Sequence, residues 1–131
     1  MDGVIGLAAT AQAMRTSASE VELLRQVIQA SDDFDALVDD EARREFIAVA
    51  TPLTGDGRYD ALLAGLAVHL CRRAGLPTTP AWTRDESRYL DRMWWFGLDG
   101  DSGLQACVFQ RTPSCMRSRG VLFNADNLAS V

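Results

Sequence analysis

Apolar residues recur along most of this chain at intervals of three or four, which is the spacing that places side chains on one face of an α-helix. The clearest case is the segment 59–74. Its apolar stripe consists of Tyr59, Leu62, Leu63, Leu66 and Leu70. Small residues fill much of its remaining surface, so neighbouring helices can pack closely on more than one side. We expect this segment to be the central helix of the fold.

Several shorter helices are predicted before it. An alanine-rich helix covers 4–14, and a second begins at the capping box Ser17-Ala18-Ser19-Glu20 and continues to about Ala30. The buried face of the second helix consists of Val21, Leu24, Val27 and Ile28. Ser31-Asp32-Asp33 is expected to interrupt the chain, after which a short helical turn carries Phe34 inward.

A third helix, 41–50, follows an N-cap at Asp39-Asp40. Pro52 ends it, because the residue before a proline avoids helical angles. The turn 54–57 then leads to the central helix, for which Thr54 or Asp56 is the expected cap. Gly75 followed by Pro77 is a strong stop signal at its other end.

The proline-rich connection 76–82 leads to a second strong helix, which the pattern extends to Phe96. Thr83-Arg84-Asp85-Glu86 is its capping box, and its inner face consists of Tyr89, Leu90, Met93 and Phe96. Adjacent side chains on a helix are about 100° apart, so Trp94 and Trp95 cannot both enter one core. The central helix and this aromatic helix are expected to form the centre of the fold.

Towards the end of the chain, the pattern predicts a helical stripe over 104–111 and a short helix from Pro113 to about Gly120. Val121–Phe123 is a brief extended hook, and a last turn covers 124–131. The predicted fold is therefore an all-α compact bundle of six to eight helices. It is a single domain over 1–131, with N-terminal helices in 1–50 and the core in 51–131.

Composition and net charge limit the kinds of molecule that the chain is expected to bind. The chain of 131 residues has 47% hydrophobic and 24% charged residues, as expected for one globular domain. Residues 1–60 hold 12 acidic and 5 basic side chains, whereas residues 61–131 hold 6 acidic and 8 basic ones. The net charge of -5 argues against the whole domain binding nucleic acid, although it leaves room for a local arginine patch.

The chain is expected to be cytoplasmic and not bound to a membrane. No apolar run approaches the ~20 residues of a membrane span. The first residues lack the basic start of a signal peptide. The three cysteines, Cys71, Cys107 and Cys115, form no Cys-x-x-Cys pair, which favours buried thiols in a reducing compartment.

No residue pattern indicates catalysis, a metal or a cofactor. His69 is the only histidine, and Asp60 is too far along the helix to serve it. Cys115 lies near Arg117 and Arg119 in the sequence, which could lower the pKa of a thiol, but no second histidine exists to act as its base. The five aspartates between positions 32 and 40 lack the glycine and terminal glutamate of a calcium loop, so capping and solvation explain them better.

Two groups of residues are candidates for binding another protein. Trp82, Trp94 and Trp95 are one group, because aromatic side chains at an edge are typical interface anchors. Arg117 and Arg119 are the other, because the guanidinium pairs with carboxylates and stacks on rings. Packing at a crowded corner and an ordinary solvated helix face are the alternative interpretations.

Part of the chain, from about Thr51 to Leu128, resembles a family of small helical domains. The matching segments are Thr54-Gly55-Asp56, Asp60-Ala61-Leu62-Leu63-Ala64, Arg73-Ala74-Gly75-Leu76-Pro77, Pro80-Ala81-Trp82, Tyr89-Leu90-Asp91-Arg92, Trp94-Trp95-Phe96 and Arg117-Ser118-Arg119-Gly120-Val121-Leu122-Phe123. The family is uncharacterised and actinobacterial. Its domains occur alone or behind helix-turn-helix domains in regulators and antitoxin-like proteins. The resemblance implies a regulatory role and assigns no catalytic residue.

Together these observations favour a non-catalytic protein-binding module. We expect it to be an antitoxin-like or regulatory partner of another cytoplasmic protein, such as a toxin, or to self-associate. The acidic N-terminal half could cover a basic site on that partner. A DNA-binding transcriptional regulator and a small enzyme of unknown reaction are the alternatives.

Overall fold

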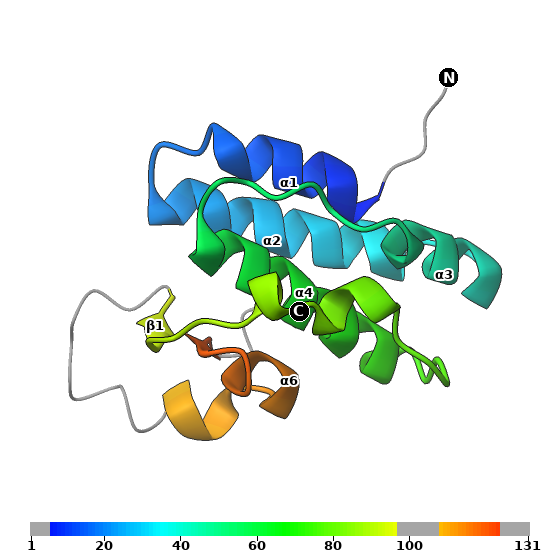
Figure 1. The fold of residues 1–131 in the computed structure, drawn as a ribbon. Coiled ribbons are helices and arrows are strands. Elements are labelled where there is room, and N and C mark those ends of the chain that lie inside the picture. The colour runs from blue at the N-terminus through cyan, green and yellow to red at the C-terminus, as the bar shows by residue number, and fades with distance from the viewer. Residues whose placement is uncertain (1–5, 97–107, 124–131) are drawn as a thin grey trace.

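The computed structural model describes residues 6–96 and 108–123 and shows a mostly helical molecule, which confirms the predicted fold class (Figure 1). Four α-helices come first: α1 (Leu7–Arg15), α2 (Glu20–Asp35), α3 (Asp40–Ala48) and α4 (Gly57–Arg73). Two 3-10 turns follow, η1 (Ala81–Arg84) and η2 (Glu86–Arg88). The remaining elements are β1 (Trp94–Trp95), α6 (Ser114–Arg117) and β2 (Val121–Leu122), and residues 108–111 are also helical.

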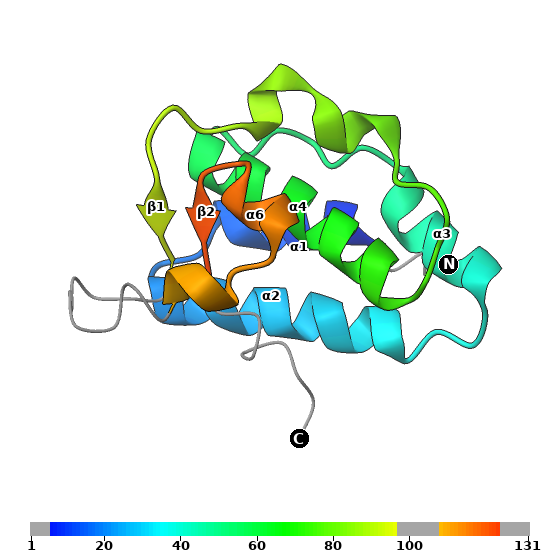
Figure 2. The same cartoon turned by 90° about the horizontal axis from the view of Figure 1, so that it is seen from below.

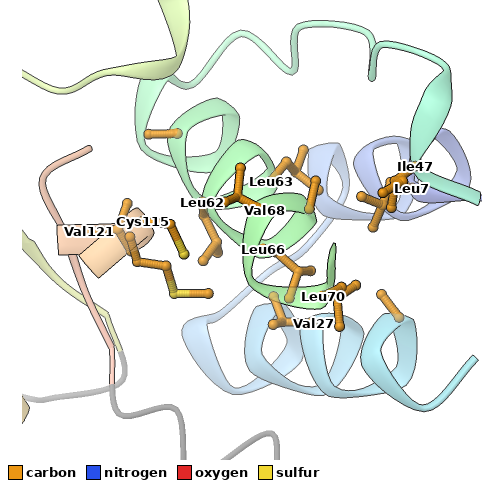
Figure 3. Packing of buried hydrophobic residues seen from close by; sticks show 14 of the residues in the cluster. Leu7, Val27, Ile47, Leu62, Leu63, Leu66, Val68, Leu70, Cys115 and Val121 are labelled. Carbon is orange, nitrogen blue, oxygen red and sulfur yellow. The ribbon is translucent and has the colours of Figure 1, made fainter. Parts of the chain in front are cut away.

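The helix α4 is the centre of the molecule, as the sequence predicts. Eleven of its 17 residues are buried, and a helix that is buried on nearly every side belongs to a core. It contacts α1, η1, η2, α6 and β2. Figure 3 shows Leu66 and Leu70 facing Val27 of α2, while Leu62 lies towards Cys115 and Val121 on the other side.

Local signals place several element ends correctly. The side chains of Asp39 and Asp56 cap α3 and α4 by accepting hydrogen bonds from the backbone N–H groups of Ala42 and Arg58. Gly75 has a φ of 74°, the left-handed conformation that commonly ends a helix. Pro113 directly precedes α6, and Val121–Phe123 is extended and buried as predicted.

The predicted break at Ser31-Asp32-Asp33 is wrong, because α2 continues through it as one helix of 16 residues. Its buried stripe has spacings of four, three and four: Leu23, Val27, Ala30 and Phe34. The capping box also lies two residues later than predicted, with Ser19 accepting from the N–H of Glu22 at 3.2 Å. Val21, which was expected in the core, is 66% exposed.

The predicted aromatic helix ending at Phe96 does not form. Asp85 has extended backbone angles, with φ -65° and ψ 144°, so η1 and η2 are separate turns. The backbone N–H groups of the following segment bond to the C-terminal hook, and Trp94 N–H donates to the carbonyl of Gly120 at 2.8 Å. The strands β1 and β2 are parallel, with Trp94 opposite Val121 and Trp95 opposite Leu122.

Because the aromatic segment is not a helix, its buried and exposed side chains differ from those predicted. Phe96 is buried as expected, but Tyr89 is 41% and Met93 is 60% exposed. In a strand, consecutive side chains point to opposite faces, so Trp94 turns inward and Trp95 outward. The predicted stripe at 104–107, including Cys107, and the last turn 124–131 lie outside the described residues.

Candidate functional site

Trp82 attaches the proline-rich connection to α3 rather than projecting from the surface. Its indole N–H donates a hydrogen bond of 2.9 Å to the carbonyl of Ile47. The guanidinium carbon of Arg88 lies 4.8 Å from its ring centroid. Both contacts hold the ring in place, so the structure gives Trp82 a role in packing.

Arg88 is a buried cation that the sequence did not single out. It is 3% exposed and donates to the hydroxyl and carbonyl of Thr51 at 3.0 and 2.7 Å. Its Nε has no hydrogen-bond partner among the described residues. Burial lowers the pKa of Arg88, and the charges of Asp60 and Asp85 act in the opposite direction. Arg88 therefore fixes the segment after α3 against η2.

Trp94 and Trp95 have different surroundings. Trp94 is nearly buried, with its ring centroid 4.9 Å from that of Phe96 and 6.1 Å from that of Tyr59. The guanidinium carbon of Arg58 covers the Trp94 ring at 5.2 Å. Trp95 is only partly buried. Of the two, Trp95 is the one with surface available to a partner.

Arg117 and Arg119 also differ. Arg117 is partly exposed and lies 5.1 Å from the ring centroid of Phe109. Arg119 is 5% exposed and donates to the carbonyl of Thr83 at 2.6 and 3.2 Å and to that of Cys115 at 2.8 Å. Arg119 thus joins η1 to α6 inside the molecule, and this position corrects the expectation of an exposed anchor.

The buried side of Arg119 borders a cavity of about 360 Å³, which we call the arginine pocket. Its charged lining residues are Arg72, Arg84 and Arg119. Burial raises the pKa of the Cys115 thiol, which also lines this pocket and donates to the carbonyl of Gly65 at 3.5 Å. A thiol with a raised pKa is a poor nucleophile at neutral pH.

His69 is half-buried, and the pKa of its imidazole is lowered, mainly by burial and further by Arg73, against the opposite effect of Asp35. Within 6–96 and 108–123, no group of three or more His, Cys, Asp or Glu side chains could hold a metal ion. Across the same residues, no helix is both long and apolar enough to cross a membrane.

A second feature is the acidic turn. We define it as residues 32–41, which run from the last turn of α2 through the connection to the first residues of α3. Its carboxylates are those of Asp32, Asp33, Asp35, Asp39, Asp40 and Glu41. In its middle, Val38 is 90% exposed. Arg43 holds the turn by donating to Asp40 at 3.3 Å and to the carbonyl of Leu37 at 2.8 Å.

The fold separates the acidic turn from the predicted aromatic and arginine anchors. Seen from both directions, α3 and the acidic turn lie at one end of the molecule, and β1, β2 and α6 lie at the other (Figures 1 and 2). Trp95 and Arg117 therefore cannot share one small contact surface with the acidic turn.

Comparison of the chain with protein-family models, curated proteins and solved structures found no significant match.

Proposed function

We propose that this chain is a non-catalytic protein-binding module, an antitoxin-like or regulatory partner of another cytoplasmic protein, and that its acidic turn covers a basic surface of that protein. The observation that carries the proposal is Val38, an almost fully exposed apolar side chain within a segment rich in aspartate. Interfaces commonly combine an apolar centre with a polar rim, and complementary charge speeds the encounter of the two proteins.

The acidic turn concentrates negative charge at the end of a helix. Asp32, Asp33 and Asp35 occupy the last turn of α2, which contains no basic residue. The carboxyl end of a helix carries partial negative charge, which disfavours carboxylates there. Side-chain contacts offset this effect: Asp35 pairs with Arg73 at 2.8 Å, and Asp33 accepts from the side-chain amide of Gln29 at 2.9 Å. Asp32 and Asp35 are still exposed, so their carboxylates can face a basic partner.

The acidic turn is also held in one conformation. Asp39 caps α3, Arg43 bonds to both Leu37 and Asp40, and the N–H of Leu37 donates to the carbonyl of Phe34 at 3.2 Å. A surface that is already ordered loses less conformational entropy on binding. These contacts support the proposal that the turn presents Val38 to a partner.

The two alternatives find less support in the fold. A DNA-binding regulator would use exposed arginines in the second half of the chain. Two arginines of this half, Arg88 and Arg119, are internal, whereas others such as Arg72 and Arg84 are exposed. A small enzyme would need a pair of reacting groups, and in the described part of the chain no hydrogen bond links His69 to a hydroxyl, thiol or carboxylate. The surface residues Trp95 and Arg117 remain candidates for a separate contact.

The test compares partner capture by tagged wild-type chain and two variants in extracts of the native host. Val38→Asp places a charge at the centre of the proposed contact. The double variant Asp32→Asn/Asp33→Asn removes two negative charges, keeps the size of both side chains and retains an oxygen at position 33 that can accept from Gln29. We expect the wild type to capture a basic partner. Each variant should bind this partner with an affinity at least about tenfold lower.

Val21→Asp is the matched control, because Val21 is an exposed valine near the start of α2, at the opposite end of this helix from the acidic turn. It should capture the partner as well as the wild type does. Equal capture by Val38→Asp and Val21→Asp would contradict the proposed surface. Absence of any protein that depends on Val38 would contradict the function itself.

A further inference from the structure

The arginine pocket is independent of the acidic turn and has a different chemistry. It lies between α4, η1 and α6, and its volume of about 360 Å³ is within the range of small-molecule pockets. Arg72 comes from the last turn of α4, Arg84 from the end of η1, and Arg119 follows α6. Three arginines that are distant in the sequence thus line one cavity.

These positive charges have no acidic counterpart in the pocket. Among the described residues, none that lines it is Asp or Glu, and no ion pair involves Arg72, Arg84 or Arg119. Burial lowers the pKa of Arg119 most; Tyr89 and Cys115 act in the opposite direction, and the charges of Arg72 and Arg84 make smaller contributions that lower it. Three like charges at one cavity are unfavourable unless an anion joins them.

Hydrogen-bond donors remain available around the pocket. Arg72 donates to the hydroxyl of Ser114 at 3.3 Å, and Arg84 donates to the hydroxyl of Thr79 at 2.7 Å. Each hydroxyl accepts in these bonds and keeps its own O–H to donate. Arg119 uses three N–H groups on backbone carbonyls, which leaves two of the five that a guanidinium carries.

We propose that the arginine pocket binds the phosphate group of a small molecule. A phosphate offers close to two negative charges and three acceptor oxygens, which matches several arginines and hydroxyls better than a single carboxylate does. The cavity is larger than one phosphate needs. Val68 and Tyr89 also line the cavity and could contact an organic group attached to the phosphate.

The shape of the pocket favours a small ligand over a nucleic-acid backbone. Arg119 is 5% exposed and recessed behind Tyr89, whose ring centroid is 4.8 Å from its guanidinium carbon. A duplex presents its phosphates along a convex surface and is usually bound by exposed arginines. DNA binding is therefore an alternative outcome of the experiment and not the proposal.

The experiment titrates the full chain with phenyl phosphate and with inorganic phosphate, followed by calorimetry and by amide chemical shifts. We expect saturable binding at one site, with shifts at the residues of the arginine pocket. Arg72→Gln and Arg84→Gln should each weaken phenyl phosphate binding about tenfold, since each removes one charge-assisted hydrogen bond to the phosphate. Both side chains are exposed. The hydrogen bonds that they lose go to the hydroxyls of Ser114 and Thr79 and, at 3.5 Å, to the carbonyl of Thr79, so the fold should persist.

Arg25→Gln is the matched control, because it removes the same charge from an exposed position on α2. It should change the affinity by less than about twofold. Tighter binding of phenyl phosphate than of inorganic phosphate would assign the site to a phosphate ester, and equal affinity would assign it to free phosphate. Either result supports a phosphate site.

A second measurement does not need the variants to fold. Phenylglyoxal modifies accessible arginines, and phenyl phosphate should slow its reaction with Arg72 and Arg84 while leaving Arg25 unaffected. Absence of saturable binding by both phosphates would overturn the proposal. Equal weakening in Arg25→Gln, or salt-sensitive DNA binding through Arg84 without phosphate binding, would overturn it as well.

Discussion

At the scale of single residues, two buried arginines hold the irregular second half of the chain together. Arg88 ties Thr51 to η2, and Arg119 ties Thr83 to α6. Both bond to backbone carbonyls, and no ion pair involves either one in the described ranges. Such a cation costs desolvation free energy, which its hydrogen bonds and stacking on an aromatic ring offset.

Arg88→Ala should lower the free energy of unfolding by about 3 kcal/mol, because it leaves the carbonyl of the buried Thr51 without its donor and removes the contact with the Trp82 ring. Chemical denaturation measures this change. Arg92→Ala, at an exposed position nearby, should stay within about 0.5 kcal/mol of the wild type. Similar losses in the two variants would show that Arg88 has no special role.

His69 should make stability depend on pH. The pKa of His69 in the folded chain is below its usual value of 6.5, so between these two values the unfolded chain binds more protons. The free energy of unfolding contributed by this group therefore falls as the pH decreases through about 6.5. Urea unfolding from pH 7.5 to 5 should show a smaller decline for His69→Gln than for the wild type. Identical slopes would contradict the assignment.

At the scale of elements, α4 and α6 approach each other closely. A Cβ at Gly65 would lie 2.9 Å from Cγ and 3.3 Å from Cα of Met116, so the two helices meet through the glycine. The short helix α6 consequently packs against the middle of α4 and positions Cys115 and Met116 in the core. Both helices also line the arginine pocket, α4 through Val68 and Arg72 and α6 through Ser114 and Cys115.

Gly65→Ala tests this packing, because the substitution would normally stabilise a helix by about 1 kcal/mol. Here we expect a net loss of about 1–2 kcal/mol in the free energy of unfolding, since Met116 and its backbone must move. The matched comparison is Gly65→Ala combined with Met116→Ala, which makes room for the added methyl group. A stabilised Gly65→Ala single variant would mean that α6 adjusts freely.

At the scale of the whole molecule, the fold places the acidic turn and the arginine pocket on different elements. The helical layer formed by α1, α2 and α3 carries the acidic turn, while the irregular segments packed on α4 bring the arginines of the second half together (Figure 1). The two proposed binding surfaces are therefore distinct, and each test leaves the other unaffected. One chain could hold a protein at one surface and a phosphate at the other.

The sequence by itself determined the elements whose signals are local. The stripe of α4 is visible because 3.6 residues per turn repeat over many positions, and the caps at Asp39, Asp56 and Gly75 act through neighbours a few residues away. The extended Val121–Phe123 was also predicted correctly, because a short apolar run after a glycine favours a buried strand. The excess of acidic residues in the first half could be counted in the sequence, but the position of the acidic turn in the fold could not be predicted from it.

Only the tertiary structure decided the aromatic segment and the arginines. Trp94–Phe96 fits a helical spacing, yet its backbone bonds to residues 120 and 122, more than 20 positions away, and no local pattern reveals such a pairing. Arg88 and Arg119 look like surface residues until distant carbonyls and rings surround them. Spacing within a segment sets which face is apolar, whereas burial depends on what the rest of the chain places against that face.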